Sequence, residues 1–166
     1  MDRVLIRQIS QEDIEGFHSC LDSVARERKY LGFTEASSLE ELRASLLEDI
    51  KRDVIRLVAV DNSTVVGWCQ IKAGRWEGYT HMGWLQMGVH KEYRGQGIAT
   101  ALLSQALEEA RIRGLERVEL DVYASNLAAI QLYVKYKFEV EGRKKRARKL
   151  DGSYDDIIDM ALLFDT

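Results

Sequence analysis

The sequence contains no proline, only two cysteines, no long apolar run and no excess of positive charge. Without proline, the ends of helices and strands must be read from glycine, asparagine, aspartate and serine. Cys20 and Cys69 lack a second cysteine or a histidine at metal-ligand spacing, so we expect buried thiols in a reducing cytoplasm and no metal site. No apolar run approaches the roughly 20 residues of a membrane span, and the first ten residues resemble a strand more than a signal peptide.

The charge balance excludes a general attraction to nucleic acid or to an anionic membrane. The 24 basic and 27 acidic residues give a formal net charge of -3, and a protein that binds polyanions usually carries a basic field. The run Arg143–Lys149 is basic only locally. We interpret it as a solvated edge strand protected by Lys and Arg, with an acidic group of a substrate as the alternative partner. The 166 residues, without linker or repeat, predict a single domain over 1–166.

Hydrophobic periodicity predicts an α+β domain of three layers. Alternating patterns predict strands at 4–9, 56–60, 65–72, 80–89, 118–122, 138–149 and 154–164. Helical patterns follow two capping boxes, at Ser10 with Asp13 and at Ser38 with Glu41, and two further patterns begin at Gly97 and Asn126. The strand–helix–strand unit over 85–122 requires a parallel crossover, so we expect a mostly antiparallel twisted sheet of about seven strands with this crossover at its centre and about four helices.

The segment Arg94-Gly95-Gln96-Gly97-Ile98-Ala99 joins the central strand to its helix. A helix N-terminus offers unpaired N–H groups and partial positive charge to a pyrophosphate, and glycines at 95 and 97 remove side chains that would hold an anion away. The pattern differs from the dinucleotide-binding G-x-G-x-x-G and from a Walker A loop. Taken alone, it leaves a plain tight turn as the alternative.

The run 87–103, with Arg94-x-x-Gly97-x-Ala99, resembles the central motif of the GNAT superfamily of N-acetyltransferases. The resemblance implies a GNAT-type fold and acetyl-CoA as co-substrate, with the turn amides on the pyrophosphate and the preceding strand along the pantetheine arm. A second motif at 122–133, V-x-x-x-N-x-x-A-I-x-L-Y, also resembles the family, and it implies that Tyr133 is the general acid for the leaving thiolate. Its one departure is Lys137, where members commonly have Gly. The residues implied to bind the cofactor are Met87, Gly88, Val89, Arg94, Gly95, Gln96, Gly97, Ile98, Ala99, Thr100, Asn126 and Tyr133.

The general base does not follow from the resemblance. Some members place a glutamate on the central strand where this chain has Gly83. His81, Glu119, Asp121 and a water chain are the alternatives. We expect direct transfer in a ternary complex, with the N–H of Val89 on the tetrahedral oxyanion, in preference to an acetyl group carried by Cys69.

The acceptor is predicted to be a primary amine of a small molecule: an amino acid, a polyamine or an amino antibiotic. Alternatives are a protein N-terminus or lysine, and a sensor that binds acetyl-CoA without turnover. The resemblance places the acceptor site near 26–31 and leaves a homodimer open. The aromatic residues around the loop at 73–78, Trp68, Trp76, Tyr79 and Trp84, are expected to be mostly core. The alternative is that some of them line an acceptor pocket with this loop as its rim.

Overall fold

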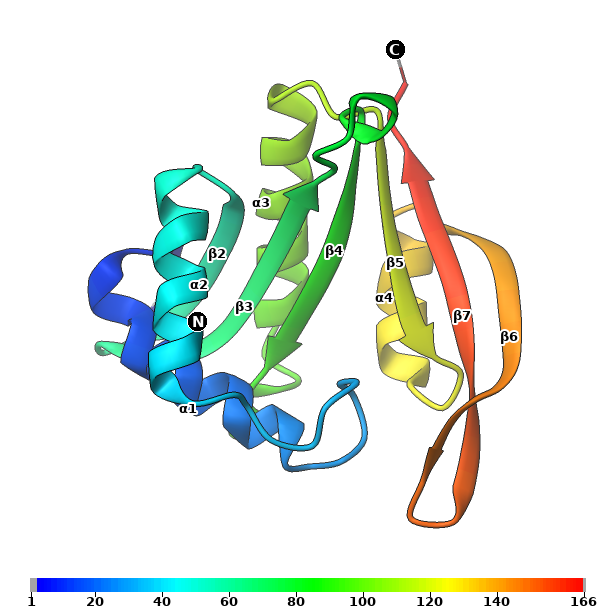
Figure 1. Ribbon diagram of the computed structural model, residues 1–166, viewed down its shortest axis with the longest axis horizontal. Helices are drawn as coiled ribbons and strands as arrows, with labels where there is room; N and C mark the ends of the chain where they lie inside the picture. Colours follow the sequence, from blue (N-terminus) through cyan, green and yellow to red (C-terminus); the bar gives the residue numbers. More distant parts are fainter. Residues whose placement is uncertain (1–2, 166) are drawn as a thin grey trace. The chain divides into compact units, whose positions relative to one another are not determined.

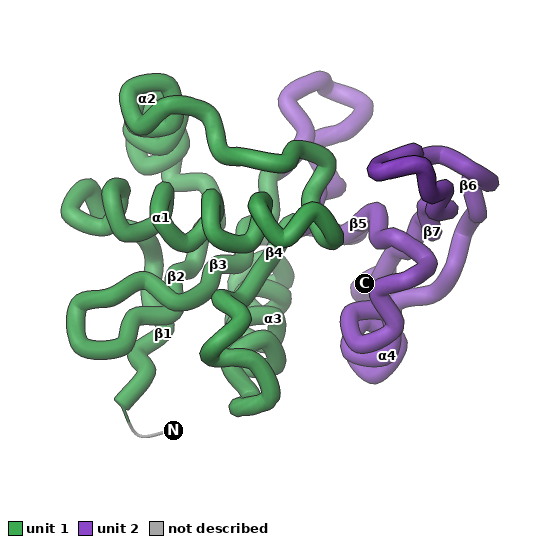
Figure 2. Tube along the Cα trace, turned by 90° about the horizontal axis from the view of Figure 1, so that it is seen from below, with its two compact units in different colours: residues 1–72, 86–113 green, residues 73–85, 114–166 purple. Residues whose placement is uncertain are grey.

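The computed structural model describes residues 3–165, in which seven strands and four helices form two compact units. One unit comprises the residues up to 72 together with 86–113, and the other comprises 73–85 with the residues from 114 onward (Figure 2). The strands are β1 (Val4–Gln8), β2 (Ile55–Asp61), β3 (Thr64–Ala73), β4 (Met82–Val89), β5 (Arg117–Tyr123), β6 (Glu139–Leu150) and β7 (Ser153–Leu163). The helices are α1 (Ile14–Ala25), α2 (Leu39–Lys51), α3 (Ile98–Ile112) and α4 (Leu127–Lys135).

The strand order β1-β2-β3-β4-β5-β7-β6 contains the parallel crossover that the sequence predicts. β4 and β5 pair in parallel, from Met82 opposite Arg117 to Trp84 opposite Glu119. The pairs β1–β2, β2–β3, β5–β7 and β6–β7 are antiparallel. The predicted fold class, a mostly antiparallel sheet of seven strands with four helices, is therefore confirmed (Figure 1).

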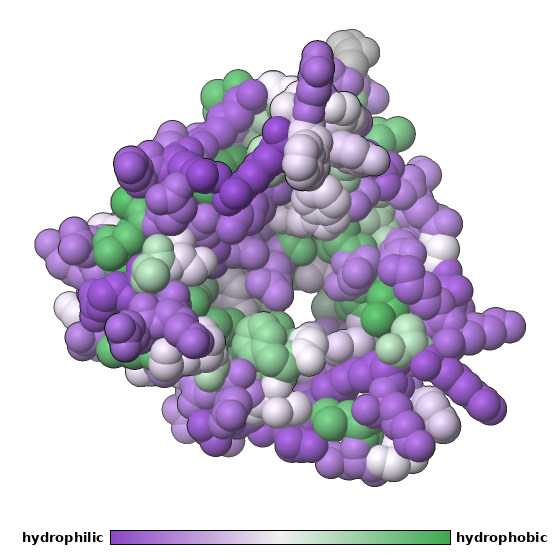
Figure 3. All heavy atoms as spheres, viewed as in Figure 1, coloured by the Kyte–Doolittle hydropathy of each residue, from purple (hydrophilic) through white to green (hydrophobic). Residues whose placement is uncertain are grey.

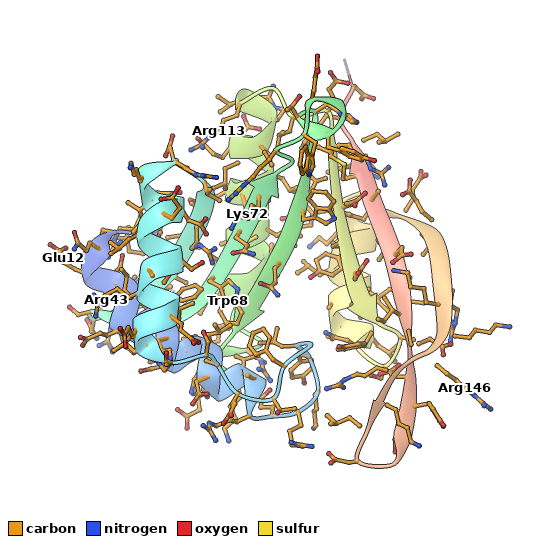
Figure 4. All side chains as sticks on the ribbon, viewed as in Figure 1. Glu12, Arg43, Trp68, Lys72, Arg113 and Arg146 are labelled. Carbon is orange, nitrogen blue, oxygen red and sulfur yellow. The ribbon has the colours of Figure 1, made fainter. Side chains whose placement is uncertain are left out.

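In the first unit, helices cover both faces of β1, β2 and β3. α1 and α2 lie on one face and α3 lies on the other (Figure 2). α3 buries the predicted stripe of Ile98, Leu102, Ala106 and Ala110, as the helical period requires. On the opposite face, the fully buried Trp68 of β3 meets Phe17 of α1 edge to face, with ring centroids 5.8 Å apart (Figure 4). The sheet of the first unit is thus covered by apolar side chains on both faces, with Trp68 and Phe17 in the core cluster beneath α1 and α2.

A buried ion-pair network attaches α2 to the strands of the first unit. The Asp49 carboxylate of α2 accepts a 2.6 Å hydrogen bond from Arg56 of β2. The ammonium group of Lys72 on β3 lies 3.0 Å from the same carboxylate (Figure 4). Because Arg56 is buried, removing Asp49 would leave its guanidinium charge uncompensated, which is strongly destabilising.

In the second unit, α4 lies beside β5 and β7 (Figures 1 and 2). The Asn126 side chain caps α4 by accepting from the Ala129 N–H, as the sequence predicts. Lys137, which departs from the family pattern, adopts φ 73° directly after the helix. Its position is the left-handed C-terminal cap at which glycine has no steric cost, so this lysine occupies a turn that would favour glycine.

Two expectations about the segment before β4 are wrong. The strand expected over 80–89 begins at Met82, because Glu77–Tyr79 form a 3-10 turn and Thr80 ends it. Trp68 is core, but Trp76, Tyr79 and Trp84 are 79%, 53% and 47% exposed. Trp76 and Tyr79 lie in the loop between β3 and β4 and not on the sheet. Trp84 precedes the buried Leu85 on β4, so its side chain points to the opposite face of the strand.

β6 forms the edge of the second unit, and hydrophilic side chains dominate its surface (Figure 3). Most of the cations in the run 143–149 have partners within this unit. Arg143 pairs with Asp156 at 2.7 Å and Lys144 with Asp159 at 3.0 Å, while Arg146 projects outward near the Tyr154 ring (Figure 4). These contacts favour the interpretation of a protected edge strand.

Candidate functional site

The connection between β4 and α3 has the conformation that an anion-binding turn needs. Gly95 and Gly97 adopt φ 75° and 81°, values that glycine reaches without steric cost. Gly97 is the N-cap of α3 and makes no side-chain cap, so no capping side chain occupies the first N–H groups of the helix. A Cβ atom at Gly95 would meet no other atom within 4 Å, which means that the backbone of the turn is open to approach.

The end of β4 is held in place by close packing. A Cβ atom added to Gly88 would lie 2.4 Å from the Trp68 ring, so Gly88 lets this buried ring pack directly against the strand. The Val89 side chain is buried and that of Met87 is half-buried. In the turn, the Gln96 side chain is exposed, whereas Ile98 belongs to the core and Ala99 and Thr100 are half-buried. The predicted cofactor residues of this run thus lie at the end of one strand, in the turn that follows it and in the first turn of α3.

Arg94 is held on three sides by residues of its own unit. Its Nε donates to the Val89 carbonyl at 2.8 Å, and an Nη donates to the Glu27 carboxylate at 2.9 Å. The guanidinium carbon lies 4.9 Å from the centroid of the Tyr30 ring. Local sequence patterns do not reveal these partners, because 67 positions separate Glu27 from Arg94. Arg94 therefore helps to build the turn besides carrying a positive charge near it.

In the second unit, Asn126 and Tyr133 lie on α4, whose first turn Asn126 caps. The Tyr133 side chain is buried, and its ring centroid lies 5.6 Å from that of Phe138. The Phe138 N–H donates to the Tyr133 carbonyl at 3.0 Å. The helix α4 and the contact with Phe138 together fix the orientation of the Tyr133 ring.

Two of the three candidate bases line a hollow of about 300 Å³ in the second unit. Glu119 and Asp121 alternate along β5 and share one face with Asp159 of β7, which stands opposite Asp121 in the register. Glu119 accepts two hydrogen bonds from Arg117 at 2.8 and 3.0 Å, so its charge is neutralised. The exposed Trp84 lies at the same hollow, whereas His81 is not among its lining residues.

Asp121 differs from its neighbours in its proton affinity. Partial burial, followed by the hydrogen bond with Asp159, raises the pKa of Asp121 above its ordinary value, and the nearby Lys144 offsets part of this. The pKa of Asp159 is lowered, because it accepts hydrogen bonds from Asp121 and Lys144. Two adjacent carboxyl groups whose ionisation is linked titrate as a pair. The sequence contains no local sign of this pairing, which depends on the register of β5 and β7.

The two thiols are not activated. Burial raises the pKa of Cys20 to about 12 and raises that of the completely buried Cys69 further. A nucleophilic cysteine needs the opposite shift and access to its substrate. This environment weighs against an acetyl group carried by Cys69. In the described residues 3–165 no group of three or more His, Cys, Asp or Glu is arranged to hold a metal ion, and no helix there is long and apolar enough to span a membrane.

Comparison with known proteins relates the chain to acetyltransferases. The model of the acetyltransferase (GNAT) family matches residues 18–138. An L-amino acid N-acetyltransferase, AaaT of Escherichia coli, is 32% identical over 64% of this chain and 66% of its own length. N-alpha-acetyltransferase 30 of Schizosaccharomyces pombe is 37% identical over 49% of this chain and 55% of its own. The matched part of the chain thus spans just under two thirds of the length of the first relative and about half of the length of the second.

Solved structures match over nearly the whole chain. The acetyltransferase of the GNAT family from Streptococcus pneumoniae aligns with a TM-score of 0.90 and 28% identity, covering 97% of this chain and 99% of that one. The structure of yncA from Salmonella typhimurium with its cofactor acetyl-CoA also aligns with a TM-score of 0.90, over 98% of this chain and 95% of that one, at 20% identity. The second likeness concerns the fold alone.

Proposed function

Since this chain belongs to the acetyltransferase (GNAT) family, we propose that it transfers an acetyl group from acetyl-CoA to a primary amine of a small molecule. The observation that carries the proposal is the turn after β4. There, Gly95 and Gly97 in left-handed conformations leave the N-terminus of α3 uncovered, which suits a pyrophosphate. In this proposal residues 1–166 act as one catalytic domain.

The proposed cofactor contacts follow the strand, turn and helix in order. The backbone at Met87, Gly88 and Val89 pairs with the pantetheine arm in the manner of an added strand. The amides of residues 94–100 and the Arg94 charge hold the pyrophosphate, and Asn126 contributes from the start of α4. Support comes from the fold likeness to a structure that contains acetyl-CoA and from the open backbone at Gly95.

In the proposed reaction the amine nitrogen attacks the thioester carbonyl, and the N–H of Val89 stabilises the oxyanion. The C–N bond forms and the C–S bond breaks, so the electron pair leaves on sulfur. As the amide forms, the attacking nitrogen must lose a second proton; Tyr133 donates a proton to the thiolate and regains one from this nitrogen. Asp121 accepts the proton that the ammonium group must lose before it can attack. The unactivated thiols favour this direct route over a covalent intermediate.

The hollow in the second unit favours a cationic acceptor. Four carboxylates line it, from Glu119, Asp121, Glu141 and Asp159, against the two cations Arg117 and Lys144. Both cations are already paired with carboxylates there, so the excess charge is negative and attracts an ammonium group. Its size of about 300 Å³ is at the lower end of small-molecule sites.

Release of free thiol from acetyl-CoA tests the proposal directly. We expect release with at least one member of a panel of amino acids, polyamines, aminoglycosides and short peptides. A response to peptides alone would favour the second candidate, acetylation of a protein N-terminus, which the likeness to N-alpha-acetyltransferase 30 supports. Binding of acetyl-CoA in a calorimeter without release from any amine would favour a sensor, and no binding would overturn the proposal.

Replacing Asp121 with asparagine is expected to remove the acid limb of the pH profile. The base must be ionised, and because its pKa is raised, activity of the unmodified enzyme falls as the pH drops through that raised value. We expect kcat/KM of Asp121→Asn to be about tenfold lower near pH 7, with the two enzymes converging at high pH, where the amine loses its own proton.

Glu119→Gln is the matched control for this measurement. Glu119 lies on the same face of β5, but Arg117 already neutralises it, so its loss should change kcat/KM less than twofold. His81→Gln tests the remaining side-chain candidate. Equal losses in the Glu119 and Asp121 variants would contradict the assignment of Asp121.

A further inference from the structure

The connection between α1 and α2, residues 26–38, is attached to the turn that follows β4. Glu27 lies in this connection, and its carboxylate accepts the 2.9 Å hydrogen bond from Arg94. The side chain of Glu27 is 17% exposed and that of Arg94 is 33% exposed. An ion pair largely withdrawn from water is screened less by salt than a surface pair, so it restrains both side chains.

The connection presents Glu27 from a backbone that is itself held. The N–H of Glu27 donates to the Val24 carbonyl at 3.2 Å. Further along, the N–H of Ala36 donates to the Asp22 carboxylate at 2.9 Å, and Leu31 is buried in the core. The position of the carboxylate is therefore determined by the fold of the connection before any ligand binds.

Tyr30 fixes the plane of the same guanidinium group. Its ring centroid lies 4.9 Å from the guanidinium carbon, within the range of a cation–π contact. The planar guanidinium group donates one hydrogen bond to the Val89 carbonyl and one to Glu27, and the Tyr30 ring lies beside it. The group therefore retains little rotational freedom. Arg94 has five N–H donors, and these two hydrogen bonds leave others for a ligand.

The restraint reaches the backbone at the end of β4. The Val89 carbonyl accepts from Arg94 at 2.8 Å, and the next N–H, that of His90, donates to the Val66 carbonyl at 2.8 Å. Both polar groups of the peptide between Val89 and His90 are thus held. This peptide leads directly into the turn whose amides the proposed function assigns to the pyrophosphate.

We propose that Glu27 and Tyr30 are positioning residues for pyrophosphate binding, which they support through Arg94. This inference rests on the proposed function, because it concerns the same turn. Glu27 holds the guanidinium by charge and Tyr30 by ring contact, and Arg94 then holds the end of β4 and the start of the turn. The connection between α1 and α2 is thereby coupled to cofactor affinity.

The test compares acetyl-CoA with S-acetylpantetheine, which keeps the thioester and the arm but lacks the pyrophosphate. For Glu27→Gln we expect KM for acetyl-CoA to rise about tenfold with kcat at saturation within twofold. The kcat/KM for S-acetylpantetheine should stay within twofold, since this thioester has no phosphate for the turn to bind and the hydrogen bond from His90 to Val66 still holds the end of β4. A general packing defect would instead lower activity with both thioesters.

Further variants sharpen the comparison. Glu35→Gln removes another carboxylate of the same connection, which pairs with exposed Arg26 at 3.5 Å, and should leave KM unchanged. Tyr30→Phe should match the unmodified enzyme, whereas Tyr30→Leu should raise KM for acetyl-CoA. In an Arg94→Gln background, Glu27→Gln should have no further effect, because it acts through Arg94.

The inference is overturned if Glu27→Gln leaves KM for acetyl-CoA unchanged, or if it impairs both thioesters alike. If Glu27→Gln does not fold, Tyr30→Leu decides the question by the same two criteria. The unmodified enzyme distinguishes this failure from failure of the proposed function. If the unmodified enzyme turns over normally and the variants have unaltered KM, only the positioning role is contradicted. If the unmodified protein binds no acetyl-CoA, both the positioning role and the proposed function are contradicted.

Discussion

Replacing Tyr133 with phenylalanine is expected to lower kcat by about a hundredfold or more, the usual contribution of a general acid. The substitution deletes only the hydroxyl group. The ring that remains would keep the contact with Phe138, now at 5.6 Å between centroids, so the fold and the cofactor affinity should change little. Steady-state turnover at saturating acetyl-CoA measures the effect on kcat. Calorimetric titration with acetyl-CoA measures the effect on cofactor affinity.

Tyr136→Phe is the matched control for Tyr133→Phe. Tyr136 caps the C-terminus of the same helix, and it has no part in the proposed chemistry, so its hydroxyl should be dispensable. If Tyr133→Phe and Tyr136→Phe both retain full turnover, Tyr133 is not the acid. If acetyl-CoA affinity falls as much as turnover, the phenol serves binding instead.

Gly97→Leu is expected to weaken acetyl-CoA binding by about a hundredfold, which corresponds to about 2.7 kcal/mol. Gly97 has φ 81° and caps α3. A side chain there would occupy the approach to the first amides of the helix, and a residue with a Cβ atom also disfavours this conformation by about 1–2 kcal/mol. Calorimetric titration with acetyl-CoA measures the loss of affinity.

Gly114→Leu separates the effect on the ligand from the effect on the backbone. Gly114 follows the other end of α3, has φ 83°, and a Cβ atom there would meet no other atom within 4 Å. Both variants should therefore lose a similar free energy of unfolding, but only Gly97→Leu should lose affinity. Equal affinities in the two variants would remove the turn from the proposed cofactor site.

Much of the fold follows from patterns along the chain because those patterns are local. The Ser10–Asp13 capping box, the Asn126 cap and the apolar stripe of α3 each involve residues only a few positions apart. The parallel crossover followed in the same way from one helix between two strands. The exposure of Trp76 and Tyr79 did not follow, because hydrophobic character alone does not say whether a loop turns toward the core or away from it.

The residues of the proposed site likewise fall into those that local patterns predict and those that only the folded chain brings together. The sequence by itself determined the glycine turn, its place before α3 and the tyrosine of α4, since each depends on residue type and short spacing. Only the tertiary structure decided the partners: Glu27 and Tyr30 beside Arg94, and Asp159 beside Asp121. Such contacts join residues dozens of positions apart, and strand register and helix packing bring them together. The chemistry of a residue is local, whereas its orientation and its pKa depend on neighbours that only the folded chain supplies.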